Sequence, residues 1–264
     1  MFVDSHAHFD LCLEKKGCRE EDLLNGLDVA GIAGAVQVSI DVEGFEGSRD
    51  FARRHRDRGI RFTLGIHPSS RATAIELGKM DDYVEEVVKS PEADLLFGIG
   101  ECGLAYYRMH QPREMQRESF HFQIELAKRW DLPLIVHSRD ALEETLQILK
   151  EAGIRKGIMH CFSGDGAAAA RVLDLGFYLS FAGNVTYKNA VELHDSAAYT
   201  PADRMLIETD APFLTPVPLR GKPNRPEYVT HTYQYIADLK KMTLDQLRDT
   251  VWRSYQTLAG LNKR

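Results

Sequence analysis

Eight short apolar runs recur along the chain, and each is followed by an amphipathic stretch or a long polar connection. The runs are continuous rather than alternating, which is typical of strands buried on both faces of a parallel sheet. They are Met1–Asp4, Ala35–Ile40, Arg61–Ile66, Leu95–Gly100, Pro133–Val136, Gly157–Met159, Phe177–Phe181 and Met205–Ile207. Eight strands alternating with helices fit a closed barrel better than an open sheet of about five or six strands. We therefore predict an α/β protein with the (β/α)8 TIM-barrel fold.

Helical periodicity fills segments between these runs. Apolar residues recur three or four positions apart in three of them: Leu23, Leu24, Leu27 and Ala30; Phe120, Ile124 and Ala127; and Leu142, Leu146 and Leu149. The clearest helix begins with a capping box of Thr243 and Gln246 and presents Leu244, Leu247, Val251, Tyr255 and Leu258 on one face. In contrast, Pro212–Pro226 contains five prolines and no periodic pattern, so we expect a functional loop there.

Composition places the chain among ordinary globular proteins. It has 264 residues, of which 44% are hydrophobic and 27% are charged. Because an α/β barrel of roughly 250 residues forms one domain, we predict a single TIM-barrel domain over residues 1–264. The net charge of −6 argues against binding to nucleic acid through bulk positive charge, although it leaves room for a local basic rim.

The sequence also predicts a cellular setting. Its first residues show neither the basic nor the apolar region of a secretory signal, and no apolar run approaches the roughly 18 residues of a membrane span. We therefore expect a cytoplasmic protein that does not associate with a membrane. The cysteines, Cys12, Cys18, Cys102 and Cys161, are scattered without a CxxC pair, so we expect reduced thiols.

Side chains that can bind metal gather where the predicted strands end. His6 and His8 follow the first run, and residues two apart in an extended chain face the same side. The ends of later runs carry His67, Glu101, His137, His160, Glu208 and Asp210. Since the carboxyl ends of the strands form the active-site face of a TIM barrel, we expect these side chains to converge.

Each of these residues alone has an ordinary interpretation. A single histidine at a strand end is usually a hydrogen-bonded polar residue, and a single carboxylate there is often a helix N-cap. However, five of the ten histidines (His6, His8, His67, His137 and His160) lie at such ends. Burying several imidazoles and carboxylates together is costly unless a cation pairs with them. Histidine and carboxylate are common ligands of divalent transition metals, so the sequence predicts a metal centre.

One motif indicates a different chemistry. The segment Gly98–Gly103 matches the G-x-G-x-x-G pattern of dinucleotide-binding folds. It lies in the middle of the chain, and Glu101 would place a negative charge beside the pyrophosphate. The residues that follow, Leu104–Pro112, do not begin a clear helix. We therefore disfavour dinucleotide binding.

Taken together, the strand-end segments resemble the TatD family of metal-dependent deoxyribonucleases, within the amidohydrolase superfamily of barrels. The matching segments are Asp4–Asp10, Gly65–Pro68, Gly100–Leu104, His137–Ala141, His160–Gly164 and Glu208–Pro212, and Val185–Ala190 and Pro223–Pro226 also fit. They occur in the family's order over nearly the whole chain, which makes the set far more specific than a single H-x-H motif.

The resemblance implies a two-metal hydrolase that cleaves phosphodiester bonds in DNA, as an exonuclease or a 3′-end-processing enzyme. Its cofactors would be two divalent ions of Mg, Mn or Zn. One ion would be held by His6, His8, Glu101 and Asp210, and the other by Glu101, His137 and His160. Glu101 would bridge the ions, and Asp210 would be the general base. Phosphate oxygens would be bound by His67, Arg108, Arg139 and Lys188, and Glu208 would orient a ligand histidine.

Three positions depart from the family pattern. Ala105 stands where an aspartate is common, Ser69 where a histidine or an aromatic residue is frequent, and Ser254 where an asparagine is usual. None of them is a predicted metal ligand, so we expect them to affect substrate range and rate and to have little effect on metal binding.

Two alternative functions stay open. The same centre could act on an amide or an ester, such as a D-aminoacyl-tRNA, or the chain could be a non-catalytic metal-binding barrel. Phosphate-binding arginine, lysine and histidine at the loop tips would favour DNA, whereas a small enclosed apolar pocket would favour the amide or ester. A monomer is compatible with each of these functions.

Overall fold

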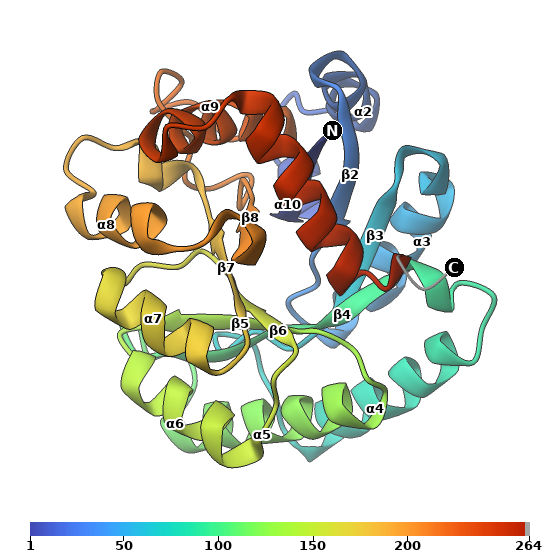
Figure 1. The fold of residues 1–264 in the computed structure, drawn as a ribbon. Coiled ribbons are helices and arrows are strands. Elements are labelled where there is room, and N and C mark those ends of the chain that lie inside the picture. Colours follow the sequence, from blue (N-terminus) through green and yellow to red (C-terminus); the bar gives the residue numbers. More distant parts are fainter. Residues whose placement is uncertain (262–264) are drawn as a thin grey trace. The chain divides into compact units, whose positions relative to one another are not determined.

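A computed structural model describes residues 1–261 and contains eight strands in one sheet (Figure 1). The strands are β1 (Phe2–Ala7), β2 (Ile32–Gln37), β3 (Ile60–Leu64), β4 (Leu96–Ala105), β5 (Leu134–Arg139), β6 (Gly157–Met159), β7 (Tyr178–Phe181) and β8 (Met205–Ile207). They follow one another in chain order, and the pairs β3–β4, β4–β5, β5–β6 and β7–β8 are parallel. This order, with helices between the strands, confirms the predicted TIM-barrel class.

The helices include all four that the periodicity predicts, namely α2, α5, α6 and α10. The α-helices are α1 (Phe9–Leu13), α2 (Glu20–Ala30), α3 (Phe45–Arg54), α4 (Ala74–Val88), α5 (Arg113–Arg129), α6 (Leu142–Ala152), α7 (Gly166–Asp174), α8 (Val191–Tyr199), α9 (Val229–Lys240) and α10 (Leu244–Leu258). Short 3₁₀ helices are η1 (Val42–Gly44), η2 (Arg56–Arg58), η3 (Ala93–Leu95), η4 (Gly183–Thr186), η5 (Ala202–Arg204) and η6 (Pro226–Tyr228). Within residues 1–261, no helix is both long enough and apolar enough to cross a membrane.

Several strands extend beyond their apolar runs. β6 and β8 have the predicted bounds, but β1, β4 and β5 continue to Ala7, Ala105 and Arg139. The extensions contain histidine, glutamate and glycine, which interrupt the apolar pattern although the backbone continues in strand conformation. His6, Glu101 and His137 therefore lie inside strands rather than after them.

The described chain divides into two compact units. Unit 1 consists of Met1–Val36, Cys161–Asp174 and Tyr178–Arg264, and unit 2 consists of Gln37–His160 and Leu175–Phe177. The single domain over residues 1–264 stays a prediction, and its last three residues lie outside the described ones.

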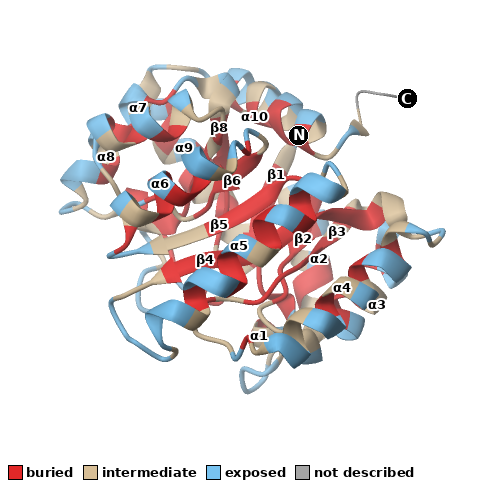
Figure 2. Ribbon diagram, turned by 90° about the horizontal axis from the view of Figure 1, so that it is seen from below, coloured by how far each residue is buried: buried red, intermediate tan, exposed pale blue. Residues whose placement is uncertain are grey.

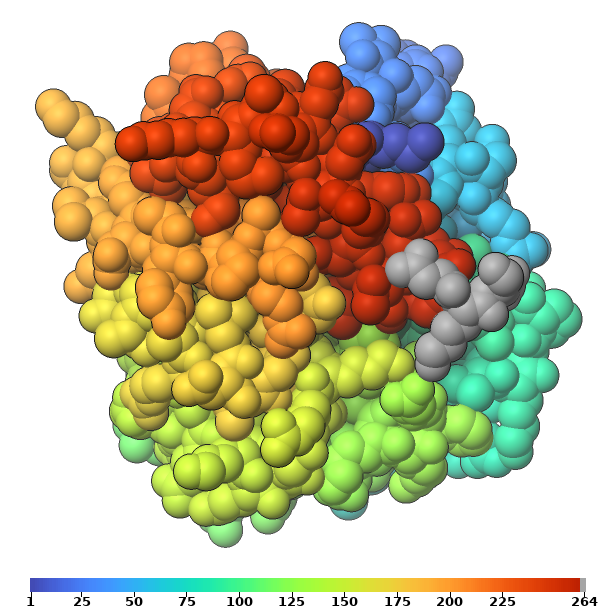
Figure 3. Space-filling view, viewed as in Figure 1, coloured from blue at the N-terminus to red at the C-terminus, as the bar shows by residue number. Residues whose placement is uncertain are grey.

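In unit 1, β1 pairs with the segment after β8. Ala7 and Ala211 form a parallel bridge, and the His8 N–H donates to the Ala211 carbonyl oxygen at 2.9 Å. α9 and α10 pack on β1 and β8, and Figure 3 shows these two helices in red on the surface of this unit. The α10 face is buried at four predicted positions (Leu247, Val251, Tyr255 and Leu258), but Leu244 is only half-buried. The predicted loop is also present, since no helix or strand lies between Ala211 and η6.

In unit 2, α5 packs on β4 and β5. Its predicted residues Phe120, Ile124 and Ala127 are buried, and Figure 2 shows the buried and exposed faces of this helix. Gln123 lies on the same face. Its side chain accepts a hydrogen bond from the Ile66 N–H at 2.9 Å and donates one to the Ile66 carbonyl oxygen at 3.0 Å. α5 therefore fixes the backbone immediately before His67.

Candidate metal centre

Three histidines surround the carboxylate of Glu101 in unit 2. The Glu101 Oε1 atom lies 2.7 Å from His137 Nδ1, 2.8 Å from His160 Nε2 and 3.5 Å from His67 Nε2. The two nearer nitrogens are 3.3 Å apart. We call these four residues the Glu101 cluster. The structure thus brings together two predicted ligands, the predicted bridging carboxylate and one predicted phosphate-binding residue.

Backbone pairing positions these side chains. Gly103 of β4 is in register with His137 of β5, and Glu101 precedes Gly103 by two residues, so Glu101 and His137 lie close together on two neighbouring strands. The His160 N–H donates to the Val136 carbonyl oxygen at 3.0 Å, which ties the end of β6 to β5. The predicted convergence of these residues is therefore a consequence of parallel strand register.

The cluster favours the ionised form of Glu101. Burial alone would raise the pKa of this carboxyl group, but His160, His67 and His137 beside it hold that pKa well below its ordinary value. Glu101 therefore remains an anion around neutral pH and is available as an oxygen ligand.

The donor set fits a divalent ion. Imidazole nitrogen with carboxylate oxygen is the combination preferred by zinc and neighbouring metals. Two donors that each lie about 2.1 Å from one ion at the tetrahedral angle are about 3.4 Å apart. The three shortest distances among Glu101, His137 and His160, from 2.7 to 3.3 Å, come close to this span. These residues can therefore hold a metal ion with little movement.

His67 differs from the other two histidines in its hydrogen bonds. The backbone N–H of Ser69 donates to His67 Nδ1 at 3.0 Å, and the Ser69 hydroxyl lies 2.7 Å from the same nitrogen. In a neutral imidazole whose Nδ1 accepts a hydrogen bond, the proton is on Nε2, the atom that faces Glu101. His67 is therefore arranged as a hydrogen-bond donor, which is the property that a phosphate-binding residue needs.

A second group of predicted ligands meets in unit 1. Asp210 Oδ1 lies 3.5 Å from His8 Nε2 and 3.9 Å from His6 Nε2. Both histidines are buried, whereas the Asp210 side chain is 14% exposed. We call these three residues the Asp210 cluster. Asp210 adopts the left-handed backbone conformation (φ 54°), which aspartate tolerates better than most residues, and its N–H donates to the His6 carbonyl oxygen at 2.9 Å.

Buried polar residues next to these ligands hold the two segments of unit 1 in register. Asp4 accepts hydrogen bonds from the Thr209 N–H at 2.9 Å and the Thr209 hydroxyl at 2.6 Å. Burial raises the pKa of Asp4 to about 8, and the bonds from Thr209 act in the opposite direction. Glu208 is fully buried and accepts the N–H of Cys161 at 2.9 Å, which fixes the segment that follows His160.

The remaining predicted phosphate-binding residues lie outside these clusters. Arg139, at the end of β5, stacks on the Tyr107 ring with 4.5 Å between guanidinium carbon and ring centroid, and Arg108 lies 5.8 Å from the same ring. Lys188 lines a pocket in unit 1 together with Arg220. Among the described residues, none of these three predicted cations forms an ion pair.

Comparison with known proteins shows the family. A family model described as "TatD related DNase" matches residues 3–260. The chain belongs to the TatD family. It is 36% identical to YcfH of Escherichia coli K12, over 97% of this chain and 94% of that protein, and 36% identical to YabD of Bacillus subtilis 168, over 99% of this chain and 100% of that protein. Both relatives are named as uncharacterized metal-dependent hydrolases.

A solved relative has the same fold. The crystal structure of YJJV, a TatD homolog from Escherichia coli K12, matches with a TM-score of 0.89 and 28% identity over 97% of both chains. Family membership makes the present protein a metal-dependent hydrolase. The motif resemblance is thereby confirmed.

Several residues near the predicted site are given no binding or positioning role by the sequence. Gln123 and Ser69 position His67 through hydrogen bonds. Gln123 falls on the buried face of a predicted helix, where a polar residue indicates a specific partner. Tyr187 and Arg220 meet across 33 residues of chain, and no local pattern connects them.

Proposed function

We propose that this protein hydrolyses phosphodiester bonds in DNA, as an exonuclease or 3′-end-processing enzyme. The Asp210 cluster and Glu101 would hold one divalent ion, and Glu101, His137 and His160 a second, with Mg²⁺, Mn²⁺ or Zn²⁺ as the candidates. The observation that carries the proposal is the approach of two imidazole nitrogens to within 2.8 Å of Glu101 in a chain whose family model is named for DNase activity. Family membership over residues 3–260 supports the sharing of Glu101 between the two ligand groups.

The ionisable residues have separate roles in this proposal. Two divalent ions, when bound, polarise a phosphate group and lower the pKa of the attacking water. Glu101 stays an anionic ligand, because its pKa is held low. Asp210 acts as the general base, since its side chain, at 14% exposure, is more accessible to water than the two buried histidines of its cluster.

Residues around the clusters bind and orient. His67 donates from Nε2 to a phosphate oxygen, and Arg108, Arg139 and Lys188 supply positive charge to the strand. Glu208 holds the backbone that follows His160, and through it the orientation of that ligand histidine. The cytoplasmic location and a monomeric state stay predictions.

The proposal is tested with purified protein and single-stranded DNA that carries a label at one end. We expect cleavage that requires a divalent ion and removes nucleotides from one end. Glu101→Ala should lose at least ~10²-fold in rate, because the substitution removes a ligand shared by both ions. Glu118→Ala is the matched control, since Glu118 is exposed on α5. No cleavage with any of the three ions, or near-normal turnover by Glu101→Ala, would reject the proposal.

A further inference from the structure

A pocket of ≈ 440 Å³ lies in unit 1 between the residues that follow η4 and the proline-rich loop. Tyr187 and Lys188 come from the first segment, and Leu214 and Arg220 from the second. The guanidinium carbon of Arg220 lies 4.2 Å from the centroid of the Tyr187 ring, a cation–π contact. The volume is within the roughly 300–1,000 Å³ of typical ligand sites.

Hydrogen bonds between the two segments fix the walls of this pocket. The Tyr187 hydroxyl donates to the Thr215 carbonyl oxygen at 3.0 Å, and the Val217 N–H donates to the Thr186 hydroxyl at 2.8 Å. The backbones also approach closely, since a Cβ on Gly183 would lie only 2.2 Å from the Leu214 carbonyl oxygen. The pocket is therefore formed by two segments that hydrogen bonds hold together.

The charge of the pocket is positive. Its lining includes Lys188 and Arg220 and no carboxylate. Both cations are exposed, and neither forms an ion pair with any residue from 1 to 261. Leu193 and Leu214 add an apolar wall. A ligand that matches the two cations and the apolar wall carries an anionic group beside a flat apolar group, and a nucleotide has both.

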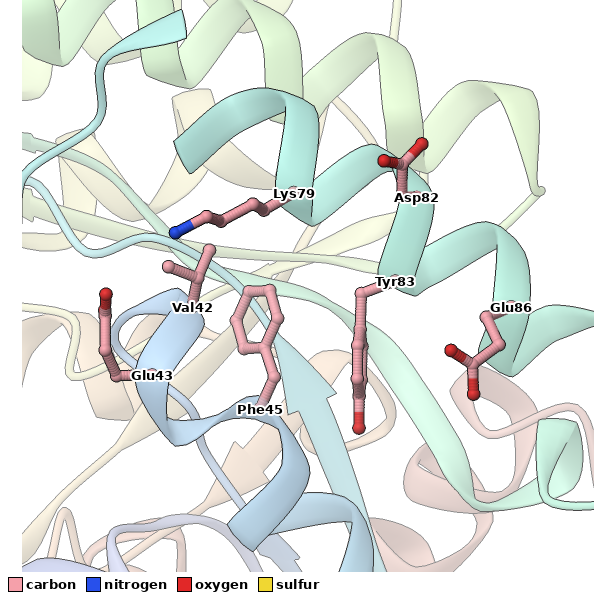
Figure 4. A pocket seen from close by; sticks show the side chains of 7 residues that line it. All are labelled: Val42, Glu43, Phe45, Lys79, Asp82, Tyr83 and Glu86. Atoms are coloured by element: carbon pink, nitrogen blue, oxygen red, sulfur yellow. The ribbon is translucent and has the colours of Figure 1, made fainter. Parts of the chain in front are cut away.

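A pocket of similar volume in unit 2 has the opposite charge. It measures ≈ 430 Å³ and lies between η1 and α4. Figure 4 shows the carboxylates of Glu43, Asp82 and Glu86 around its aromatic residues, with Lys79 as its one lysine or arginine. In a protein of net charge −6, the unit 1 pocket is therefore a local exception that can bind an anion.

The pocket is close to the Asp210 cluster along the chain. Leu214 follows Asp210 by four residues, which limits their Cα separation to about 14 Å. Phe213 lies between them, and its ring centroid is 6.3 Å from that of His8. Its N–H donates to the Asp210 carbonyl oxygen at 2.8 Å, and its side chain is 48% exposed. An exposed aromatic side chain thus lies beside His8 of the cluster, one residue before Leu214 of the pocket.

We propose that this pocket binds a nucleotide that flanks the scissile bond of a single DNA strand. Arg220 and Lys188 contact its phosphate, and Leu193, Leu214 and the Tyr187 ring form the wall against its base. The inference rests on the proposed nuclease function. It adds Tyr187 and Arg220 to Lys188, the one residue of this pocket that the family resemblance implies as a phosphate-binding residue.

The test measures binding separately from cleavage. Metal-loaded protein is titrated with a fluorescein-labelled, cleavage-resistant phosphorothioate single strand, and the affinity is measured by fluorescence anisotropy at several salt concentrations. The slope of log affinity against log salt is about −0.7 for each phosphate neutralised in a single strand. Arg220→Ala and Lys188→Ala should each make the slope shallower by about 0.7.

Two further variants separate phosphate binding from a structural role. Arg220→Lys keeps the charge and should retain the wild-type slope. Arg204, just before β8, makes a comparable contact, with its guanidinium carbon 4.7 Å from the centroid of the Tyr178 ring. Arg204→Ala removes this contact and should leave the slope unchanged. Thermal unfolding of each variant verifies that it is folded.

Each outcome decides the proposal. A slope in Arg220→Ala equal to that of the wild type, or no binding of the strand by the wild type, would overturn the pocket assignment. If the unmodified strand is still cleaved in that case, the nuclease function stands without the pocket. If the phosphorothioate strand binds with the expected slopes but the unmodified strand is not cleaved with any divalent ion, the nuclease function fails and the anion site stands.

Discussion

Gly65, the residue after β3, offers a direct test of how tightly Glu101 is positioned. A Cβ at this residue would lie 2.1 Å from the carbonyl carbon of Gly100, 2.4 Å from its Cα and 2.6 Å from the nitrogen of Glu101. Carbon atoms in favourable contact are about 3.5–4.0 Å apart, so the overlap in Gly65→Ala exceeds about 1 Å. The neighbours are backbone atoms, which cannot rotate away as a side chain would.

The cost of this substitution follows from the contact. Overpacking in a protein interior costs about 1–3 kcal/mol, and we expect the upper end because β4 itself must shift. A loss of about 3 kcal/mol in unfolding free energy corresponds to a fall of about 6–12 °C in Tm for a chain of this size. The shift also moves Glu101 relative to His137. Since a displacement of about 1 Å can cost about 10²-fold in rate, DNA hydrolysis should fall by a similar factor.

Urea unfolding followed by circular dichroism, together with the DNA cleavage assay, measures both effects. Gly78→Ala is the matched control, because Gly78 lies in α4 and nothing would lie within 4 Å of its added Cβ. This control should be more stable than the wild type by about 0.5–1 kcal/mol. A Gly65→Ala protein within about 1 kcal/mol of the wild type, with normal turnover, would refute the reasoning from close packing.

Three other substitutions probe separate features. The Lys240 ammonium group donates to three carbonyl oxygens at the end of α8, at 2.6 to 3.2 Å. Lys240→Met removes these bonds and should lower the free energy of unfolding in urea by about 2–3 kcal/mol. As a control, Lys89→Met removes only the exposed ion pair with Glu85 and should change this free energy by less than about 1 kcal/mol. His67→Ala should raise KM for DNA and keep the wild-type metal content measured by mass spectrometry, and loss of an ion would place His67 among the ligands. In Ala105→Asp, the new carboxylate would be in register with Arg139 and would compete with phosphate for it, so KM for DNA should rise by several fold in steady-state assays. An unchanged KM would show that Arg139 does not bind phosphate.

The apolar runs predict the presence of every strand, but their bounds are wrong at β2, which spans Ile32–Gln37 rather than Ala35–Ile40, and at strands whose carboxyl ends carry candidate site residues. β6 and β8 lack charged residues and match their runs. β4 continues beyond its run through Glu101 and Gly103 to Ala105, and hydrophobicity cannot distinguish such residues from a loop. The start of α4 has a clear local signal in the sequence. Thr73 and Glu76 have the spacing of a capping box, which begins α4.

The grouping of the predicted ligands could be foreseen because register in a parallel sheet relates residues far apart in the chain. Knowing that Glu101 and His137 lie near the carboxyl ends of neighbouring parallel strands is enough to expect that they come close together. Contacts made by loops have no such rule. The stack of Arg220 on Tyr187 depends on how the proline-rich loop folds back onto η4, and hydrogen bonds to Thr215 and Val217 determine this fold. Sequence periodicity carries no information about these bonds.

The structure shows which contacts the residues that depart from the family pattern make. Ser69 places its N–H and hydroxyl beside His67 Nδ1, so this position fixes the orientation of a residue that we propose binds phosphate. The Ser254 hydroxyl donates to the Asp203 carbonyl oxygen at 3.0 Å and joins α10 to η5, a structural contact.

Ala105 is the most informative departure, because it stands in register with Arg139 on the neighbouring strand. With alanine at this position, Arg139 has no ion-pair partner within residues 1–261 and stacks on Tyr107 instead. An arginine that is held in place by an aromatic ring and keeps its charge unpaired is arranged for an external anion. The absence of the aspartate therefore strengthens the case for phosphate as the ligand of Arg139.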